Sequence, residues 1–184
     1  MNEDEGTEET KDSDPDVGED DQDPDLASPR LYGVPVTESH GQVVLHTDKN
    51  GYNDLVGALV DDGFGVCIDL CGADYLGNET RVLPEEVTPE RFEVVVNLLD
   101  IHAVRRIRIR AQVDESDPEL ISITPFYPGA EAMEREAIDM FGLQFQGHPD
   151  PTPILLPDDW EGHPLRKDFA MGRIPVQFKA VEGR

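Results

Sequence analysis

The alternation of hydrophobic and polar residues changes its period several times along the chain, and each change predicts a different element. Residues 42–47, QVVLHT, are rich in β-branched side chains and predict the first strand of a folded domain, after a lead-in, LYGVPVTESHG, marked by proline and glycine. In residues 52–60, YNDLVGALV, four aliphatic side chains recur at helical spacing and predict a short amphipathic helix. Residues 64–76 then predict a second strand, and residues 80–83 a short further one.

A hairpin is predicted in the middle of the chain. Residues 92–99, FEVVVNLL, contain three consecutive valines and favour a strand. Residues 105–113, RRIRIRAQV, alternate arginine with apolar side chains, which is the period expected of a sheet with one dry and one wet face. Because only DIHAV separates the two segments, we expect a hairpin with a short loop, and residues 120–124, LISIT, predict one further strand.

The last third of the chain predicts a helix followed by an extended arm. Residues 126–142, FYPGAEAMEREAIDMFG, begin with a Pro-Gly break and turn helical, with one apolar face formed by Ala132, Met133, Ala137, Met140 and Phe141 and the charged residues elsewhere around the axis. Six prolines beyond residue 143 forbid long helices and central strands there. The predicted fold class is therefore α+β, a small mixed or antiparallel sheet with flanking helices and a long extended C-terminal arm.

Charge and the predicted elements together divide the chain into three parts. The formal net charge is −25, and residues 1–30 hold 13 acids against Lys11 and Arg30, so the rest still carries −14. We expect residues 1–30 to be a disordered acidic tail, because they have too little apolar surface to offset the entropy of folding. Residues 31–142 are predicted to form the α+β domain, and residues 143–184 the arm. A nucleic acid or an anionic membrane surface would repel such a chain.

Cysteine usage and hydropathy limit the class of protein. The chain contains no run of about 18 apolar residues and begins with an acidic segment, so we expect a soluble, cytoplasmic protein. Cys67 and Cys71 lie in a predicted strand, where about 13 Å separates their Cα atoms, too far for a disulfide. Two thiols without further Cys or His partners also fall short of a zinc or iron–sulfur set. We interpret them as buried, reduced thiols.

The carboxylates of the helix segment EREAIDMFG do not form an obvious acid-base site. Glu134 and Asp139 are five residues apart and Glu136 points away from both, so a helix alone would not bring a pair of them together. Arg135 and Asp139 have instead the i, i+4 spacing of a helix-surface ion pair. No catalytic residues are therefore assigned.

Two histidines raise the alternative of a freestanding metal-dependent hydrolase. His148 and His163 each stand in the tripeptide GHP, with possible oxygen ligands in Asp150, Asp158, Asp159 and Asp168. The spacing matches no known metal motif, and imidazoles that cap backbone groups of the arm explain both histidines more simply. No nucleophile elbow, GxGxxG or P-loop sequence is present either. We expect neither a metal nor a cofactor in this chain.

The end of the arm has the composition of a protein interface. Trp160 lies among Asp158, Asp159 and the bases of the segment LRKD, which contributes Arg166, Lys167 and Asp168. A large aromatic side chain surrounded by charge of both signs is typical of an interface anchor. The alternative is that Trp160 folds back onto the core of its own domain.

Two blocks of this region, EREAIDMFG with the following GHP, and ILLPDDWEGHPLRKDF, resemble the signature of the 30 kDa subunit family of respiratory complex I, the C subunits of proton-translocating NADH-quinone oxidoreductases. The resemblance is continuous from about residue 128 to residue 175 and extends more loosely back to residue 42. The family's charged element corresponds to Glu134, Arg135, Glu136 and Asp139, and His148 follows. Where the family pattern has an arginine, this sequence has Thr152.

This resemblance implies a structural and assembly subunit in the peripheral arm of the complex, with no redox centre of its own. The complex would carry FMN and iron–sulfur clusters and bind quinone. The C-terminal arm would dock on the D subunit, close to the B subunit and toward the I subunit, at the cytoplasmic face of the cell membrane. The residues expected at this interface are Glu134, Arg135, Glu136, Asp139, His148, Trp160, His163, Arg166, Lys167 and Asp168. The alternative within the superfamily is the equivalent part of an energy-converting hydrogenase or of a dehydrogenase that oxidises reduced F420.

Overall fold

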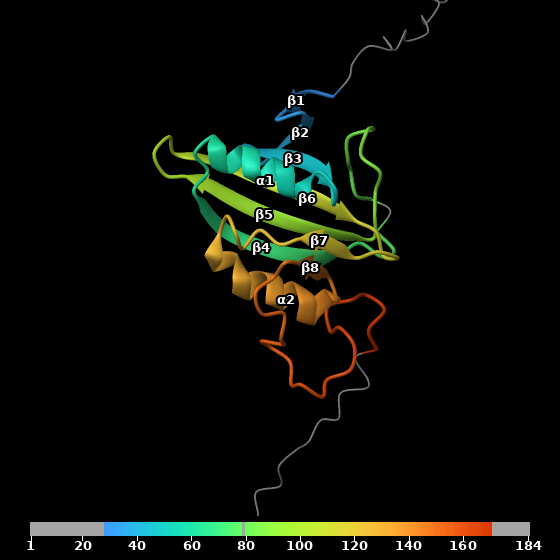
Figure 1. The fold of residues 1–184 in the computed structure, drawn as a ribbon. Helices are drawn as coiled ribbons and strands as arrows, with labels where there is room; N and C mark the ends of the chain where they lie inside the picture. The colour runs from blue at the N-terminus through green and yellow to red at the C-terminus, as the bar shows by residue number, and fades with distance from the viewer. Residues whose placement is uncertain (1–27, 79, 171–184) are drawn as a thin grey trace, which may run out of the picture.

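The computed structural model describes residues 28–78 and 80–170. One six-stranded sheet, in the order β1-β2-β3-β6-β5-β4, forms its centre (Figure 1). The strands are β1 (Arg30–Leu31), β2 (Val34–Ser39), β3 (Gln42–Asp48), β4 (Val66–Asp74), β5 (Phe92–Asp100) and β6 (Arg105–Val113). Neighbours pair antiparallel except β3 and β6, which run parallel, so the predicted mixed sheet is confirmed.

Two helices cover one face of this sheet. Helix α1 (Tyr52–Asp61) follows β3, and helix α2 (Glu131–Phe141), preceded by the short 3-10 turn η1 (Pro128–Ala130), packs on β4. Side chains of both helices belong to the same hydrophobic core as the inward residues of β5 and β6. The α+β class predicted from the sequence is confirmed.

The hairpin of β5 and β6 follows the predicted pattern. Ile107, Ile109 and Ala111 of β6 are buried against the helices, while the arginines between them face the opposite side of the sheet. There Arg110 donates from Nε to Glu93 Oε1 over 2.5 Å, so this arginine forms an ion pair with an acid of its own chain.

Several strand predictions were wrong in their extent. The lead-in before residue 42 forms β1 and β2, because Val36 and its neighbours pair with β3 and complete the sheet. Residues 80–83 form no strand, and Val82 is 87% exposed. The strand predicted at residues 64–76 is limited to β4 and carries an irregularity between Cys67 and Asp69. Only the last three residues of the predicted acidic tail lie within the described chain.

The predicted strand 120–124 is β7 (Glu119–Ile121), and its partner lies in the segment where the sequence predicted only an arm. Strand β8 (Gln144–Gln146) pairs parallel with β7 through Leu120 and Phe145. Short strands of this kind escape a prediction based on proline content, because three residues suffice for them. The predicted arm beyond residue 170 lies outside the described residues.

The face of α2 that meets the core also differs from the prediction. Ala132 is exposed, whereas Glu134 is fully buried together with Ala137, and Asp139 is 5% exposed. Two buried carboxylates at different positions around the helix axis require hydrogen-bond donors around them. Those donors come from the segments that precede and follow the helix.

Candidate docking site at the arm junction

The buried carboxylate of Asp139 holds the beginning of the arm. Its Oδ2 accepts hydrogen bonds from three successive backbone N–H groups, those of Ile154, Leu155 and Leu156, at 3.0, 2.7 and 3.2 Å. Backbone donors that converge on an ionised oxygen form stronger hydrogen bonds than neutral pairs do. Asp139 thereby fixes the path of a segment that has no helix or strand of its own.

Arg135, one turn earlier on the same side of α2, holds the residues just before. Its Nε donates to the carbonyl oxygen of Thr152 at 2.7 Å, and its Nη2 donates to Thr152 Oγ1 and to the carbonyl oxygen of Pro153, both at 3.0 Å. The predicted ion pair between Arg135 and Asp139 is therefore wrong, because the arm occupies both side chains. Thr152, which stands where the family pattern has arginine, contributes two of the accepting oxygens.

The arm also completes the C-terminal end of α2, whose last carbonyl groups have no partner within the helix. His163 Nδ1 donates to the carbonyl oxygen of Asp139 at 2.9 Å. The N–H of Leu165 donates to the carbonyl oxygen of Met140 at 3.1 Å, and Arg166 Nε donates to the carbonyl oxygen of Phe141 at 2.6 Å. The second GHP tripeptide, which contains His163, and the following Leu165 and Arg166 thus form a cap for this helix.

Gly142 makes this cap possible. It adopts the left-handed conformation, with φ +69°, and its backbone N–H donates to the carbonyl oxygen of Ile138. A Cβ atom at this position would lie 2.4 Å from His163 Nε2 and 2.8 Å from Arg166 Nη2. A glycine therefore satisfies both the reversal of the chain and the close approach of the arm.

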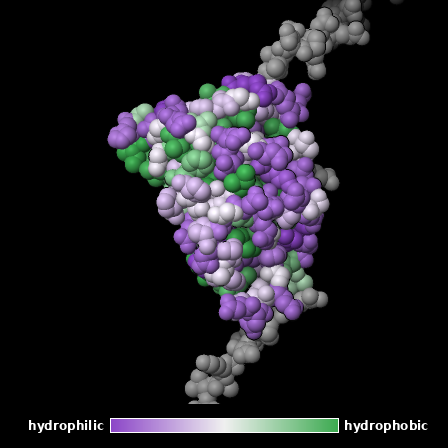
Figure 2. Space-filling model, viewed as in Figure 1, coloured by the Kyte–Doolittle hydropathy of each residue, from purple (hydrophilic) through white to green (hydrophobic). Residues whose placement is uncertain are grey.

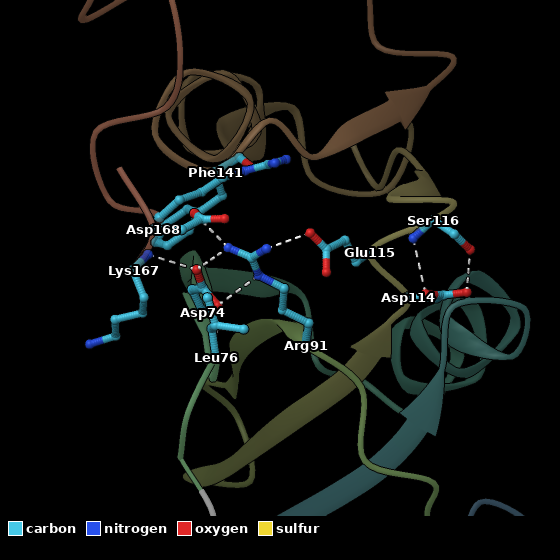
Figure 3. A network of polar contacts seen from close by, with 10 residues as sticks. Asp74, Leu76, Arg91, Asp114, Glu115, Ser116, Phe141, Lys167 and Asp168 are labelled. Carbon is cyan, nitrogen blue, oxygen red and sulfur yellow. Dashed lines mark hydrogen bonds and ion pairs between the residues drawn. The ribbon is translucent and has the colours of Figure 1, made fainter. Parts of the chain in front are cut away.

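A buried ion pair between two strand ends anchors the last part of the arm (Figure 3). Arg91 donates from Nε and Nη2 to the two carboxylate oxygens of Asp74, at 3.1 and 2.9 Å, and from Nη2 to Asp168 at 2.7 Å. The second oxygen of Asp74 also accepts the backbone N–H of Lys167 at 2.8 Å. Glu115 forms a further ion pair with Arg91 from the side opposite the arm.

The electrostatics of this anchor favour the charged forms of both partners. Burial opposes ionisation of Asp74, but hydrogen bonds from Arg91 and from the backbone N–H groups of Lys167 and Leu76 outweigh it and lower the pKa of this carboxyl. The pKa of Asp168 is lowered chiefly by its hydrogen bond from Arg91. The Arg91 side chain is 8% exposed and the Asp74 side chain 0%, so the pair is shielded from solvent and salt.

His148 caps backbone groups, as the sequence predicted for both histidines. Its Nδ1 accepts the N–H of Asp150 at 3.0 Å, which leaves the proton on Nε2, and Nε2 lies 3.0 Å from the carbonyl oxygen of Glu131. Within residues 28–78 and 80–170, no group of three or more His, Cys, Asp or Glu side chains is placed to hold a metal ion.

Glu134 supports the junction from inside the core. Its two oxygens accept hydrogen bonds from the Ser122 hydroxyl at 2.7 Å and from the N–H of Ile123 at 2.8 Å. Burial raises its pKa, and these two hydrogen bonds offset part of that effect. Glu134 thus ties α2 to the segment after β7, and it lies away from the surface of the domain.

The remaining predicted residues are not all drawn into these contacts. Glu136 is exposed on α2, and the Lys167 side chain is exposed beside the Arg91 anchor. Trp160 packs within the arm, where its ring stacks on Phe169 at 6.4 Å between centroids. It is half-buried and does not belong to the core of the domain, so it does not fold back as the alternative supposed.

Sequence reasoning missed Arg91 and Asp74, which are the centre of the anchor. Each is a single charged residue at the end of a predicted strand, and neither stands in a recognisable motif. The one available signal was their opposite charge at the ends of two strands that pair with each other. In the register of β4 and β5, Asp74 lies opposite Phe92, the residue after Arg91. The distance along the chain, 93 residues between Asp74 and Lys167, hides the connection to the arm.

The two cysteines lie on β4, near this junction, as free thiols. Cys67 is half-buried, and burial raises its pKa to about 11. Cys71 is exposed, so the prediction that both thiols are buried was wrong for this residue, which faces away from the core. Among the described residues, no helix combines the length and the apolar character that a membrane crossing requires.

Apolar side chains of the arm remain on the surface although its backbone is held. Ile154, Leu155 and Leu165 are 42%, 57% and 51% exposed. Their backbone N–H groups are bonded to Asp139 or to the carbonyl oxygen of Met140, so the arm presents them in a fixed arrangement. Exposed apolar residues grouped on an ordered segment are typical of a protein-binding surface.

Known proteins are similar to this chain in sequence. It is 41% identical to the NADH-quinone oxidoreductase C subunit of Salinispora arenicola over 80% of its length and 58% of that protein. It is also 41% identical to the corresponding C subunit of Roseiflexus castenholzii, over 80% of this chain and 81% of the relative. Its identity to NADH-quinone oxidoreductase subunit 5 of Thermus thermophilus is 42%, over 86% of this chain and 76% of that protein. The chain thus spans less than two thirds of the Salinispora relative.

Two solved structures have a similar fold. A trypsin-resistant fragment, residues 1–134, of Nqo5 superposes with a TM-score of 0.58 at 30% identity, covering 64% of this chain and 89% of the fragment. The membrane-bound sulfane sulfur reductase, an archaeal respiratory membrane complex, contains a chain that superposes with a TM-score of 0.61 at 19% identity, over 82% and 88%, which shows a shared fold. The model of the respiratory-chain NADH dehydrogenase 30 Kd subunit matches residues 45–174, and the chain belongs to this family.

Proposed function

We propose that the chain is a structural and assembly subunit in the peripheral arm of a proton-translocating NADH-quinone oxidoreductase. In this role it performs no redox step. It holds its C-terminal arm in a defined shape against neighbouring subunits, while the complex transfers electrons from NADH to quinone. Family membership and the names of the relatives support the identity of the complex.

The observation that carries the proposal is the contrast between the two sides of the arm. The charged groups of the junction are used within the chain, since Asp139, Arg135 and Arg91 all bind arm residues. The apolar side chains of the arm, led by Leu155 and Leu165, point to solvent. A segment that is fixed before binding loses little conformational entropy on docking, so its apolar contacts contribute more fully to affinity.

The partners and cofactors follow from the proposed complex. The arm would dock on the D subunit, near the B subunit and toward the I subunit, so the chain would reach the cytoplasmic face of the membrane through its partners. FMN, iron–sulfur clusters and the quinone site would belong to other subunits. The charged residues of the motif hold the arm, and the arm presents its apolar side chains. We therefore add these apolar side chains to the residues expected at the interface.

The test is affinity purification of the chain, tagged at its N-terminus, from detergent-solubilised native membranes. We expect a large complex that contains flavin and iron–sulfur clusters and has NADH-quinone reductase activity. Leu155→Asp should lower the recovery of partner chains at least tenfold, whereas Val82→Asp, at an equally apolar and more exposed position on another loop, should not. Recovery of the wild-type chain alone, or of a complex with hydrogenase activity and no NADH oxidation, would refute the proposal.

A further inference from the structure

A second exposed apolar site lies at the other end of the sheet, on the turn between β5 and β6. Asp100 organises this turn: its Oδ1 accepts the backbone N–H groups of His102 and Ala103 at 2.9 and 3.0 Å, and its Oδ2 accepts Arg105 Nε and Nη2 at 3.1 and 2.8 Å. Arg105 also donates to the carboxylate and the carbonyl oxygen of Asp62, at the end of α1. The turn is therefore held rigidly by its own polar groups.

This rigid turn presents apolar side chains to solvent. Ile101 is 62% and Val104 84% exposed. Val104 has φ +54°, a left-handed conformation that is unfavourable for a β-branched residue. Strain of this kind persists only where surrounding contacts impose it, and it is found at functional positions more often than elsewhere. Figure 2 shows hydrophobic residues at the end of the molecule where this turn lies in Figure 1.

The turn borders a hollow of about 670 Å³ on the face of the sheet opposite the helices. Leu99, Ile101 and Val104 line one part of it, and His40 and Gln42, from the turn between β2 and β3, line another. Gly41 and Arg106 complete the lining. We define these seven residues as the hairpin site.

Arg106 distinguishes the hairpin site from an ordinary apolar turn. Every other arginine within the described ranges donates a side-chain hydrogen bond to an oxygen of the protein, namely Arg30, Arg81, Arg91, Arg105, Arg108, Arg110, Arg135 and Arg166. Arg106 is exposed and has no such bond within those ranges. Arg108 and Arg166 bind an amide and a carbonyl oxygen and the other six contact a carboxylate, so among the described arginines only Arg106 has its whole guanidinium free for a partner.

We propose that the hairpin site binds an apolar segment of a neighbouring subunit, with a carboxylate of that segment paired to Arg106. Aliphatic side chains of the partner would contact Ile101 and Val104 and fill the hollow. The charge and the apolar lining together specify the chemistry of this partner, because an exposed guanidinium favours a carboxylate and the hollow favours an aliphatic group.

Two other occupants fit the observations less well. A two-fold contact between copies of this chain through so small a site would bring Arg106 close to the Arg106 of the second copy, which is repulsive. The chain's own acidic segment, residues 1–27, would approach a domain that is itself strongly acidic.

The hairpin site lies at the far end of β5 from the arm junction. Phe92 begins this strand directly after Arg91, at the anchor of the arm, and Asp100 ends it at the turn, so roughly 26 Å separates the two ends at 3.3 Å per residue. With both sites occupied, the domain would connect two neighbours and set their spacing.

Thiol labelling in the assembled complex tests this proposal. In a background with Cys67→Ser and Cys71→Ser, Ile101→Cys should react with a maleimide at least tenfold more slowly in the complex than in the isolated full chain. Val82→Cys, 87% exposed on the loop before β5, is the matched control for accessibility in the isolated chain, where both thiols should react rapidly. Arg106→Glu added to Ile101→Cys should abolish the protection.

A cross-linker attached to the same thiol identifies the occupant. We expect a peptide of another subunit that contains aliphatic residues and at least one Asp or Glu. Attachment to residues 1–27 or to a second copy of this chain would overturn the proposal, as would equal labelling rates in the complex and in the isolated chain.

Hydrogen exchange of the wild-type peptide 99–106 gives a second measurement that needs no substitution. Its exchange should slow at least tenfold on assembly, and unchanged exchange would overturn the proposal. An intact complex with an unprotected hairpin site would contradict only this inference, whereas a chain that joins no complex would contradict the proposed function.

Discussion

Asp139→Asn tests whether a single carboxylate determines the path of the arm. Three backbone N–H groups converge on its Oδ2, and the residue is 5% exposed. Asparagine keeps the shape and one accepting oxygen but removes the charge. Hydrogen bonds to charged groups contribute about 1.5–3 kcal/mol and neutral ones about 0.5–1.5, so the loss is roughly 1 kcal/mol for each bond. Because the three bonds share one oxygen, we expect about 2–3 kcal/mol in all.

This loss should appear as local opening of the arm. A change of 2–3 kcal/mol corresponds to a roughly 30- to 160-fold change in an equilibrium constant. Hydrogen exchange measured by mass spectrometry should therefore show the peptide containing Ile154, Leu155 and Leu156 exchanging faster by about this factor. A peptide from β5, which pairs with strands on both sides, should keep its wild-type rate, since the core does not depend on the arm.

Glu136→Gln is the matched control, because it removes one negative charge from the same helix at an exposed position. It should leave the exchange of the arm unchanged. Wild-type exchange of the arm in Asp139→Asn would refute the role assigned to this carboxylate. Equal acceleration of the arm and β5 would instead show that the substitution destabilises the whole domain and that the arm is not a separate unit.

Three further substitutions test other parts of the molecule. Arg91→Leu leaves the buried Asp74 carboxylate without its guanidinium and should lower the free energy of unfolding, measured in urea, by about 3–5 kcal/mol. Adding Asp74→Asn should restore part of this loss, and no recovery would contradict the pairing. Gly142→Ala places a Cβ against His163 at a left-handed position, which should lower the free energy of unfolding by at least about 1–2 kcal/mol. The arm should then become sensitive to protease, and a resistant arm would contradict this expectation. Burial and the charge of Arg110 lower the pKa of His46 from 6.5 to about 4. The unfolded chain therefore binds more protons between these values, so stability should fall by about 2 kcal/mol from pH 7 to pH 5. His46→Gln should reduce this fall, and an unchanged pH profile would show that other groups cause it.

Elements with a clear period were predictable from local sequence. The alternation in residues 105–113 identified β6 and its buried face, and the spacing of aliphatic residues identified α1, because burial of one face leaves a regular trace in the sequence. Strands β1 and β2 leave no such trace, since Pro35 and the flanking glycines resemble a loop. Their pairing with β3 outweighs that local preference.

The buried side of α2 shows a different limit. Hydrophobicity placed Ala132 on the core face and the charged residues outside, but Glu134 is fully buried and Ala132 is exposed. The hydroxyl of Ser122 and the N–H of Ile123 make this burial possible. A periodicity argument treats every carboxylate as solvated and cannot include donors that lie on another segment.

The sequence by itself determined the α+β class, the central hairpin, the family and the importance of the charged helix and the two GHP tripeptides. Only the tertiary structure decided what those charges do. Asp139 and Arg135 bind the arm and not each other, and the anchor joins Asp74 and Arg91 to residues 93 and 77 positions away. The physical reason is that periodicity and motifs indicate only which side chains are buried or recurrent. The partner of a hydrogen bond depends instead on which distant segments the folded sheet and helices bring within about 3 Å of each other.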